Sequence, residues 1–307
     1  MTRVAAVDLG TNSTRLLVAD VEDGHVEEIE RRLAITQLGE DVDRRRRLLP
    51  TAIARVRNTL VEYRRTAERH GAERVLAIAT SAVRDAENGE AFLGEVEWSY
   101  GFATQLLDGD EEALLTFRGV SAGRDLEDGT LLVDIGGGST ELVVAEAGGV
   151  GFHDSLEIGC VRLTERFGED VEACARQVRD ALPTLDVAQA IGVSGTVTAL
   201  AALDLGLVAY DPGLVEGHRL SRDGVERQLE RLAALPLEER RRVPGLEPER
   251  APVIVAGAVI LQEVLDAYGL AEIEASERDI LDGAALAAAE LPEPTEDAAP
   301  PGAYTCC

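Results

Sequence analysis

The sequence contains no lysine, so all 30 basic residues of the 307-residue chain are arginines. A Walker A loop, a protein-kinase site and a pyridoxal phosphate Schiff base each depend on a lysine. The absence of lysine therefore excludes these three large classes of phosphate-dependent enzyme. Any phosphate site in this chain must be built from arginine, backbone amides or a metal ion.

Cysteines and long apolar runs are also scarce. Cys160, Cys174, Cys306 and Cys307 have neither zinc-ligand spacing nor the pattern of a disulfide framework. No run approaches the roughly 20 apolar residues of a membrane helix, and no signal-peptide pattern opens the chain. We therefore expect a cytoplasmic protein with no membrane partner. Residues 292–307 are rich in Pro, Glu and Ala, and we expect them to be disordered.

Acidic residues greatly outnumber basic ones, giving a formal net charge of −27 at pH 7. Nucleic-acid binding requires a basic surface, so the composition argues against a nucleic-acid partner. A chain of this length is expected to hold about two domains.

One motif occurs twice. Residues Asp8–Arg15 and Asp134–Glu141 both open the pattern Asp-x-Gly-x-x-Ser-Thr-x-Leu-x-Val, 126 positions apart (134 − 8). A repeat this long indicates two homologous domains rather than a solenoid. Each copy follows an apolar strand and precedes another, so each is expected to form a glycine-containing turn between strands.

The two copies predict an anion site with a cation beside it. Glycine lets backbone N–H groups approach an anion closely, and carboxylates bind Mg²⁺. We expect Asp134 and Glu141 to be Mg²⁺ ligands, or Mn²⁺ ligands, with Asp8 helping from the other copy. The alternative is that Asp134 only caps the turn. The expected phosphate-binding residues are Gly10, Asn12, Ser13, Gly136, Gly137, Gly138, Ser139 and Thr140.

The remaining pattern alternates strands and helices in each half. We expect strands near residues 4–8, 15–21, 26–32, 74–80, 131–134, 140–145, 150–158, 190–193 and 271–275. Expected helices include 50–70, 113–120, 161–167, 171–182, 221–235, 248–268 and 278–291, the last capped by Ser276. Gly148-Gly149 is the expected turn of the second hairpin.

These motifs resemble the Ppx/GppA exopolyphosphatase family, in its short two-domain form within the acetate-kinase, sugar-kinase, Hsp70 and actin superfamily. The resemblance is carried by the two repeats together with four further motifs, in family order over roughly residues 1–290. They are Thr80-Ser81-Ala82-Val83-Arg84-Asp85-Ala86, Gly109-Asp110-Glu111-Glu112-Ala113, Gly159-Cys160-Val161-Arg162 and Ser194-Gly195-Thr196. It implies an α/β fold of two duplicated actin-like (ribonuclease H-like) domains. Each has a mixed five-stranded sheet with flanking helices, and a cleft lies between them. The expected domains are 1–125 and 126–291, with the last helix packed back on the first.

The resemblance also assigns roles. Glu112 becomes the general base that activates water, although an acid in a first helical turn can simply complement the helix dipole. Arg84 becomes a phosphate clamp, because a guanidinium binds phosphate oxygens bidentately. Gly195 and Thr196 add a phosphate contact. Ser194 is not expected to be a nucleophile, because Thr196 stands where a nucleophile elbow needs glycine.

The function that follows is hydrolysis of the terminal phosphate of inorganic polyphosphate. The alternatives are a pppGpp 5'-phosphohydrolase and a non-catalytic regulator that binds pppGpp, ppGpp or a nucleotide. A sugar or acetate kinase is less favoured, because Glu112 is not where a kinase needs its base. A homodimer stays open as the assembly.

Overall fold

The computed structural model describes residues 1–292 and divides them into two compact units. Unit 1 contains Met1–Arg124 together with the segment that begins at Ile280, and unit 2 contains Asp125–Asp279. Cys306, Cys307 and almost all of the predicted disordered tail lie outside the described residues. Within residues 1–292, no helix is long and apolar enough to cross a membrane.

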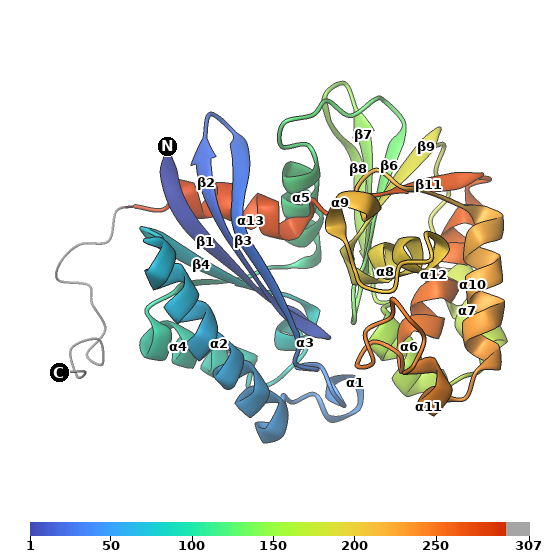
Figure 1. Cartoon of the computed structure of the whole chain (residues 1–307), viewed down its shortest axis with the longest axis horizontal. Helices are drawn as coiled ribbons and strands as arrows, with labels where there is room; N and C mark the ends of the chain where they lie inside the picture. The colour runs from blue at the N-terminus through green and yellow to red at the C-terminus, as the bar shows by residue number, and fades with distance from the viewer. Residues whose placement is uncertain (293–307) are drawn as a thin grey trace. The chain divides into compact units, whose positions relative to one another are not determined.

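Unit 1 is a five-stranded mixed sheet with the order β3-β2-β1-β4-β5 (Figure 1). Its strands are β1 (Thr2–Leu9), β2 (Ser13–Glu22), β3 (His25–Ile35), β4 (Arg74–Ala79) and β5 (Ala103–Leu106). Its helices are α1 (Val42–Arg45), α2 (Pro50–His70), α3 (Ser81–Arg84), α4 (Gly89–Tyr100), α5 (Gly109–Val120) and α13 (Ile280–Glu290). Buried residues of α2 and α4 share one core with Val7 and Leu9, whereas α13 packs with Val4 and Ala6 on the other face.

Unit 2 is a six-stranded sheet with the order β10-β11-β9-β6-β7-β8. Its strands are β6 (Thr130–Ile135), β7 (Thr140–Glu146), β8 (Gly149–Leu156), β9 (Gln189–Val193), β10 (Arg219–Ser221) and β11 (Glu272–Ala275). Its helices are α6 (Cys160–Phe167), α7 (Val171–Ala181), α8 (Ser194–Asp204), α9 (Pro212–Val215), α10 (Arg222–Ala234), α11 (Leu237–Arg240) and α12 (Ile254–Ala267). Strand β10 adds a sixth strand to the five that the sequence predicts.

The duplication extends to the strand order. Without β10, the order β8-β7-β6-β9-β11 repeats β3-β2-β1-β4-β5 element by element. In both units the first two strands are antiparallel, and the fourth strand pairs with the first in parallel. The prediction of two duplicated α/β domains of actin-like type is confirmed.

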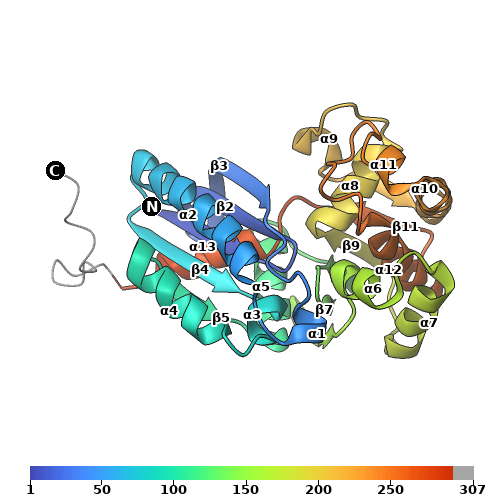
Figure 2. The same cartoon turned by 90° about the horizontal axis from the view of Figure 1, so that it is seen from below.

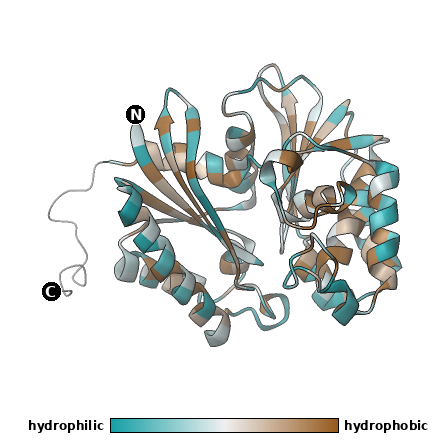
Figure 3. Cartoon of the chain, in the orientation of Figure 1, coloured by the Kyte–Doolittle hydropathy of each residue, from teal (hydrophilic) through white to brown (hydrophobic). Residues whose placement is uncertain are grey.

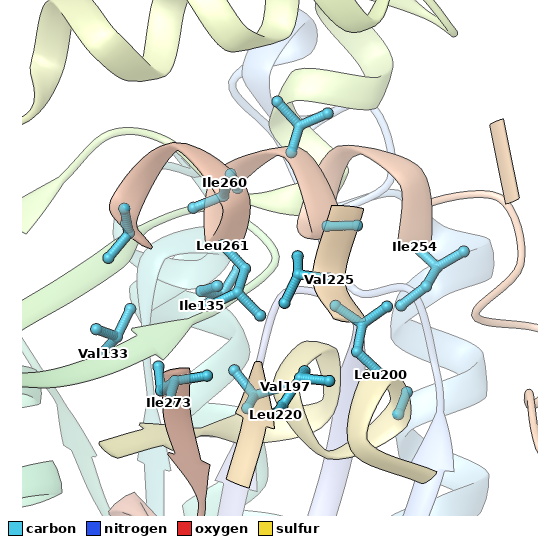
Figure 4. Packing of buried hydrophobic residues seen from close by; sticks show 14 of the residues in the cluster. Val133, Ile135, Val197, Leu200, Leu220, Val225, Ile254, Ile260, Leu261 and Ile273 are labelled. Atoms are coloured by element: carbon cyan, nitrogen blue, oxygen red, sulfur yellow. The ribbon is translucent and has the colours of Figure 1, made fainter. Parts of the chain in front are cut away.

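Strand alternation sets which residues enter the core of unit 2. Val133 and Ile135 belong to its main buried cluster, where they meet residues of α8, α10 and α12, among them Val197, Val225 and Ile260 (Figure 4). Asp134 lies between Val133 and Ile135, so it faces the opposite side of β6. On the outside of unit 2, α10 is largely hydrophilic (Figure 3).

Several predicted elements are confirmed and several boundaries are wrong. Helix α2 begins at Pro50 and ends at His70, with Gly71 in the left-handed conformation (φ 70°) as expected. Helix α5 starts at Gly109 rather than residue 113, because Asp108 caps it and forms a capping box with Glu111. Glu112 therefore stands inside a helix.

Three further differences have local causes. Helix α12 begins at Ile254, not residue 248, because Pro252 cannot donate a backbone hydrogen bond and disfavours helix at the residue before it. The second hairpin turns at Ala147-Gly148, both with positive φ, and Gly149 already belongs to β8. The Ser276 hydroxyl accepts from the Arg278 amide (3.1 Å) and α13 starts only at Ile280, so the predicted helix start is wrong.

Helix α13 belongs to unit 1, although it follows unit 2 in the chain (Figures 1 and 2). Its Asp282 is buried and accepts a hydrogen bond from Arg31 on β3 at 2.9 Å. Gly283 lies directly against α5, where a Cβ would stand 2.0 Å from the Leu115 carbonyl oxygen. The contact between α13 and α5 therefore depends on glycine at this position.

Replacing Gly283 with alanine should destabilise unit 1 by about 1–3 kcal/mol, because the added methyl group forces two packed helices apart. Gly94→Ala is the matched control, since it lies inside helix α4 with open space around the new Cβ. The control should stabilise by about 0.5–1 kcal/mol. Denaturant unfolding of both variants measures the difference, and equal effects would contradict the close contact.

Candidate active site

The glycine loop of unit 2 is bonded to the start of α6 through its carbonyl groups. The hydrogen bonds run from Cys160 N to Gly136 O (3.0 Å), from Val161 N to Gly137 O (2.9 Å) and from Arg162 Nε to Gly138 O (2.7 Å). Three consecutive carbonyls therefore point toward α6. The loop closes on itself through a bond from Gly136 N to Ser139 O at 3.0 Å.

The carbonyl bonds determine where the loop amides point. In a trans peptide the C=O of one residue and the N–H of the next point in opposite directions. The N–H groups of Gly137, Gly138 and Ser139 therefore project away from α6. Successive amides that project to one side are the elements of an anion-binding concavity.

Gly159 is what allows α6 to approach the loop so closely. A Cβ on Gly159 would lie 2.4 Å from the carbonyl carbon and oxygen of Gly137. Arg162 sits beside it with its side chain only 7% exposed, and its charge is met by Glu157 at 2.9 Å. Gly159 and Arg162 thus hold the glycine loop in shape from behind.

The loop of unit 1 repeats this construction. Gly10 N donates to Ser13 O at 3.0 Å, the counterpart of the bond in unit 2. The Thr11 carbonyl accepts from Gly39 N (2.8 Å), and the Asn12 carbonyl accepts from the amides of residues 36 and 37. By the same geometry the N–H groups of Asn12 and Ser13 point to the opposite side. Asn12 Oδ1 is buried there, with no hydrogen-bond partner among residues 1–292.

The hydroxyl groups near the loops have mixed roles. Thr140 is fully buried, and its hydroxyl donates to the Ile158 carbonyl at 2.7 Å. Its side chain therefore fixes the loop rather than facing a ligand. The Thr11 hydroxyl lies 2.8 Å from that of Ser81 on α3, which ties the unit 1 loop to the helix that ends at Arg84.

The three candidate metal ligands fall in two different environments. In unit 2, Asp134 and Glu141 are direct partners across β6 and β7, so their side chains share one face of the sheet, and both are buried. Ser155 on β8 donates to Glu141 at 2.7 Å. In unit 1, the corresponding partner of Asp8 is Arg15, whose nitrogens lie 2.8 and 2.9 Å from Asp8 Oδ2.

The donor set of unit 2 fits Mg²⁺. Two carboxylates side by side on a sheet face repel each other unless a cation lies near them, and Mg²⁺ typically takes one or two carboxylates, with waters and phosphates completing its shell. Among residues 1–292, no cluster of three or more His, Cys, Asp or Glu has the arrangement of a full metal cage. Asp134 and Glu141 would therefore supply only part of the coordination.

Glu112 and Arg84 are brought together in unit 1. Arg84 Nη1 donates to Glu112 Oε2 at 3.2 Å and to the Leu107 carbonyl at 2.9 Å. The Glu112 side chain is 9% exposed and that of Arg84 is 21% exposed. The neighbouring Glu111 instead completes the capping box of α5. The two adjacent acids therefore have separate tasks, and only Glu112 faces an arginine.

Gly195 and Thr196 open helix α8 beside an arginine that the sequence analysis missed. A Cβ on Gly195 would lie 2.1 Å from Arg250 Nη1, so the guanidinium rests on the glycine backbone. Arg250 is 8% exposed and is held by Glu247 at 3.0 Å. A helix N-terminus next to an arginine is a suitable anion site. The preceding Ser194 has a positive φ of 72°, which turns the chain sharply from β9 into α8.

Thr196 itself is turned away from this surface. Its methyl group would meet a Cβ on Gly257 at 2.6 Å, and its hydroxyl hydrogen-bonds with the Cys160 thiol. Burial raises the pKa of Cys160, an effect that the nearby Arg250 charge partly offsets. The buried thiol is therefore a packing group.

Comparison with known proteins identifies the family of the chain. A profile of the Ppx/GppA phosphatase family matches residues 17–288. The chain belongs to the Ppx/GppA phosphatase family. Exopolyphosphatase 2 of Mycobacterium tuberculosis is 37% identical over 321 residues, covering 94% of this chain and 99% of that protein.

Solved Ppx/GppA structures share the fold. An exopolyphosphatase-like protein superposes with a TM-score of 0.85 at 34% identity, over 93% of this chain and 98% of its own. The Aquifex aeolicus Ppx/GppA family member gives 0.77 at 32% identity, over 92% and 95%. This Ppx/GppA chain is therefore a hydrolase of phosphoanhydride bonds with an actin-like fold, as the resemblance implies.

The alanine variant at Gly159 tests the support of the Ppx/GppA glycine loop. The new methyl group must displace either α6 or Gly137, so we expect a loss of about 1–3 kcal/mol in the free energy of unfolding. Hydrogen exchange of the amides of Val161 and Arg162 should accelerate, because their bonds to Gly137 are broken. Gly149→Ala, whose Cβ has only one neighbour, at 3.9 Å, should change stability by less than about 0.5 kcal/mol. Unchanged exchange in Gly159→Ala would disprove the contact.

Proposed function

We propose that this chain is an exopolyphosphatase, which hydrolyses the terminal phosphate of inorganic polyphosphate with water as the attacking group. The observation that carries the proposal is the buried Glu112 carboxylate held by Arg84 on the edge of unit 1 that also carries an anion loop. A protein that only binds phosphate has no need for a buried base next to its arginine. The relatives named exopolyphosphatase support the choice of substrate.

The proposed step is a direct displacement. Glu112 orients a water molecule and accepts its proton while the water oxygen bonds to the terminal phosphorus. The bond between that phosphorus and the bridging oxygen breaks, releasing orthophosphate and a chain one phosphate shorter. Catalysis of such a transfer consists almost entirely of positioning and charge stabilisation.

The other groups of the proposal bind the substrate. Arg84 uses one nitrogen for its protein contacts, so the rest of its guanidinium is available to clamp the terminal phosphate. In each unit, the outward amides of the glycine loop would bind phosphate oxygens. Arg250, with the start of α8, would bind another phosphate of the chain. Within each unit, the arginine and the loop amides would make the surface locally positive in an otherwise acidic protein.

Mg²⁺, or Mn²⁺, would be held by Asp134 and Glu141. Bound there, it would neutralise charge on the phosphate oxygens. Asp8 would contribute less directly than the sequence predicts, because Arg15 already compensates its charge.

The alarmone pppGpp carries the same terminal phosphoanhydride and is the alternative substrate. A non-catalytic regulator that binds pppGpp or ppGpp is the alternative outside enzymes. Both are separable by assay, because polyphosphate lacks a nucleoside and a regulator releases no phosphate.

Glu112→Gln should lower kcat for polyphosphate by about 10²–10⁴-fold, because the amide keeps the shape but cannot accept the proton. Glu111→Gln is the matched control: it changes charge equally in the same helical turn, and glutamine still serves in a capping box. Phosphate release with Mg²⁺ from long polyphosphate and from pppGpp measures both. Full activity in Glu112→Gln would show that another group is the base. If the unaltered protein releases no phosphate from either substrate, the proposal that it is an enzyme is refuted.

Asp134→Asn and Glu141→Gln should each raise the Mg²⁺ concentration needed for half-maximal activity by at least about tenfold, since each removes an anionic ligand. Glu146→Gln, an exposed acid at the end of the same strand β7, should leave it unchanged. Titration of Mg²⁺ into chelator-treated enzyme gives the values. A metal requirement that is the same in all four proteins would place the ion elsewhere.

A further inference from the structure

A connecting segment of unit 1, residues 36–48, is built onto the anion loop. The amides of Thr36 and Gln37 donate to the Asn12 carbonyl, and Gly39 N donates to the Thr11 carbonyl. A Cβ on Gly39 would lie 2.3 Å from Thr11 Cγ2, so the segment and the loop are in tight contact. The start of the segment therefore has a fixed position next to the candidate phosphate site.

The other end of the segment is fixed to residues 85–88, which directly follow the helix that carries Arg84. The Arg46 carbonyl accepts from Glu87 N at 2.8 Å, and Arg46 Nη2 lies 3.9 Å from Asp85, the residue after Arg84. Leu48 is fully buried and exchanges two hydrogen bonds with the Asn88 side chain. Helix α1, in the middle of the segment, accordingly lies beside α3 in both views (Figures 1 and 2).

The backbone of the segment is strained. Six non-glycine residues among residues 1–292 have positive φ: Asp23, Gln37, Asp41, Arg46, Ala147 and Ser194. Asp23 and Ala147 lie in hairpin turns, and Ser194 opens α8. The other three, Gln37, Asp41 and Arg46, fall within ten consecutive positions of this segment. Left-handed conformations of non-glycine residues cost energy and concentrate at ligand clamps and active sites. Four consecutive exposed arginines, Arg44–Arg47, lie in this part of the segment.

The four arginines are not equally engaged. Arg44 and Arg45 share the single carboxylate of Asp41, at 3.1 and 2.8 Å. Arg46 is 55% exposed and has only the 3.9 Å contact with Asp85. Arg47 is exposed and has no partner in the part of the chain that the structure describes. The positive charge of Arg46 and Arg47 is therefore largely available.

We propose that Arg46 and Arg47 form a distal subsite for a linear polyanion, binding the part of a polyphosphate chain that lies beyond the phosphates at the cleavage site. The assignment of polyphosphate rests on the proposed function. Long chains would reach the arginines, whereas a chain of three phosphates would be held by the cleavage site alone. The subsite would thus favour long substrates over short ones.

The charge of the protein makes such a subsite useful. A chain with a net charge of −27 repels a polyanion at long range. A run of arginines anchored between the anion loop and Arg84 would offset that repulsion where the substrate enters. The simpler alternative is a solvated basic loop with no ligand, which is one outcome of the test below.

The test compares two double variants of unit 1 that lose the same charge. Arg46→Gln with Arg47→Gln removes the subsite. Arg64→Gln with Arg65→Gln removes two arginines of α2 paired with Glu68 and Glu62 of the same helix. At 1.5 Å per residue, Arg64 lies about 20 Å along α2 from Pro50, so the control charges are remote from the run. Thermal unfolding verifies that both proteins fold.

Two measurements are made. Binding of long polyphosphate is measured in the Glu112→Gln background to prevent turnover, and it should weaken about 10–100-fold in the subsite variant. The slope of the logarithm of the binding constant against the logarithm of the salt concentration should become shallower by about 1–2, by analogy with about 0.7 per phosphate in single-stranded nucleic acid. KM for long polyphosphate, measured with active enzyme, should rise by a similar factor while KM for tripolyphosphate stays constant.

Each outcome has a distinct meaning. Equal effects in the two double variants, or an equal rise in KM for tripolyphosphate, would refute the distal subsite while the exopolyphosphatase proposal stands. Arginine-dependent binding without hydrolysis by the unaltered protein would support the subsite and refute the proposed function. If the protein with all of its arginines does not bind long polyphosphate, both the distal subsite and the proposed function are refuted.

Discussion

A trans peptide bond points its C=O and the following N–H in opposite directions, and both glycine loops of this protein are governed by that constraint. Bonding every loop carbonyl on one side leaves the amides on the other side for a ligand. The parts that bond the carbonyls, α6 in unit 2 and residues 36–39 in unit 1, are therefore as necessary to the site as the loops. This explains why Gly159 and Gly39, outside the repeated motif, have no room for a side chain.

The two units use the same scaffold for different charges. At the corresponding pair of strand positions, unit 1 has Asp8 opposite Arg15, and unit 2 has Asp134 opposite Glu141. The first pair combines an acid with a base, whereas the second combines two acids. Duplication therefore preserved the turn between the two strands but not the charge of the residue pair that flanks it. Unit 1 instead contributes the pair of Glu112 and Arg84.

The sequence predicts what local rules determine. The repeated motif leads to two sheets of the same strand order, and Pro50 and Gly71 mark both ends of α2. The sequence does not predict that Arg250 lies beside Gly195, because Arg250 falls within a run whose apolar spacing is typical of one continuous helix. Only Pro252, which delays α12 until Ile254, signals that Arg250 stands in a turn instead. Strand β10 is missed because three residues are too few for a pattern.

Similarly, the sequence places Glu112 in its motif but not beside its arginine. Arg84 and Glu112 are 28 positions apart, and their contact depends on how β4 and β5 bring α3 and α5 to one edge of the sheet. Tertiary pairing of this kind has no local signal. The roles of Asp134 and Glu141 remain predictions, although their pairing in register across two strands follows from the turn that joins them.

The placement of α13 has a consequence for biosynthesis. The last described helix packs on the first sheet, so unit 1 lacks one of its layers until the whole of unit 2 has been synthesised. Unit 2 is contiguous in sequence, so all of its strands and helices are synthesised before α13. The apolar face of unit 1 that carries Val4 and Ala6 therefore cannot be covered by α13 until all of unit 2 has been synthesised.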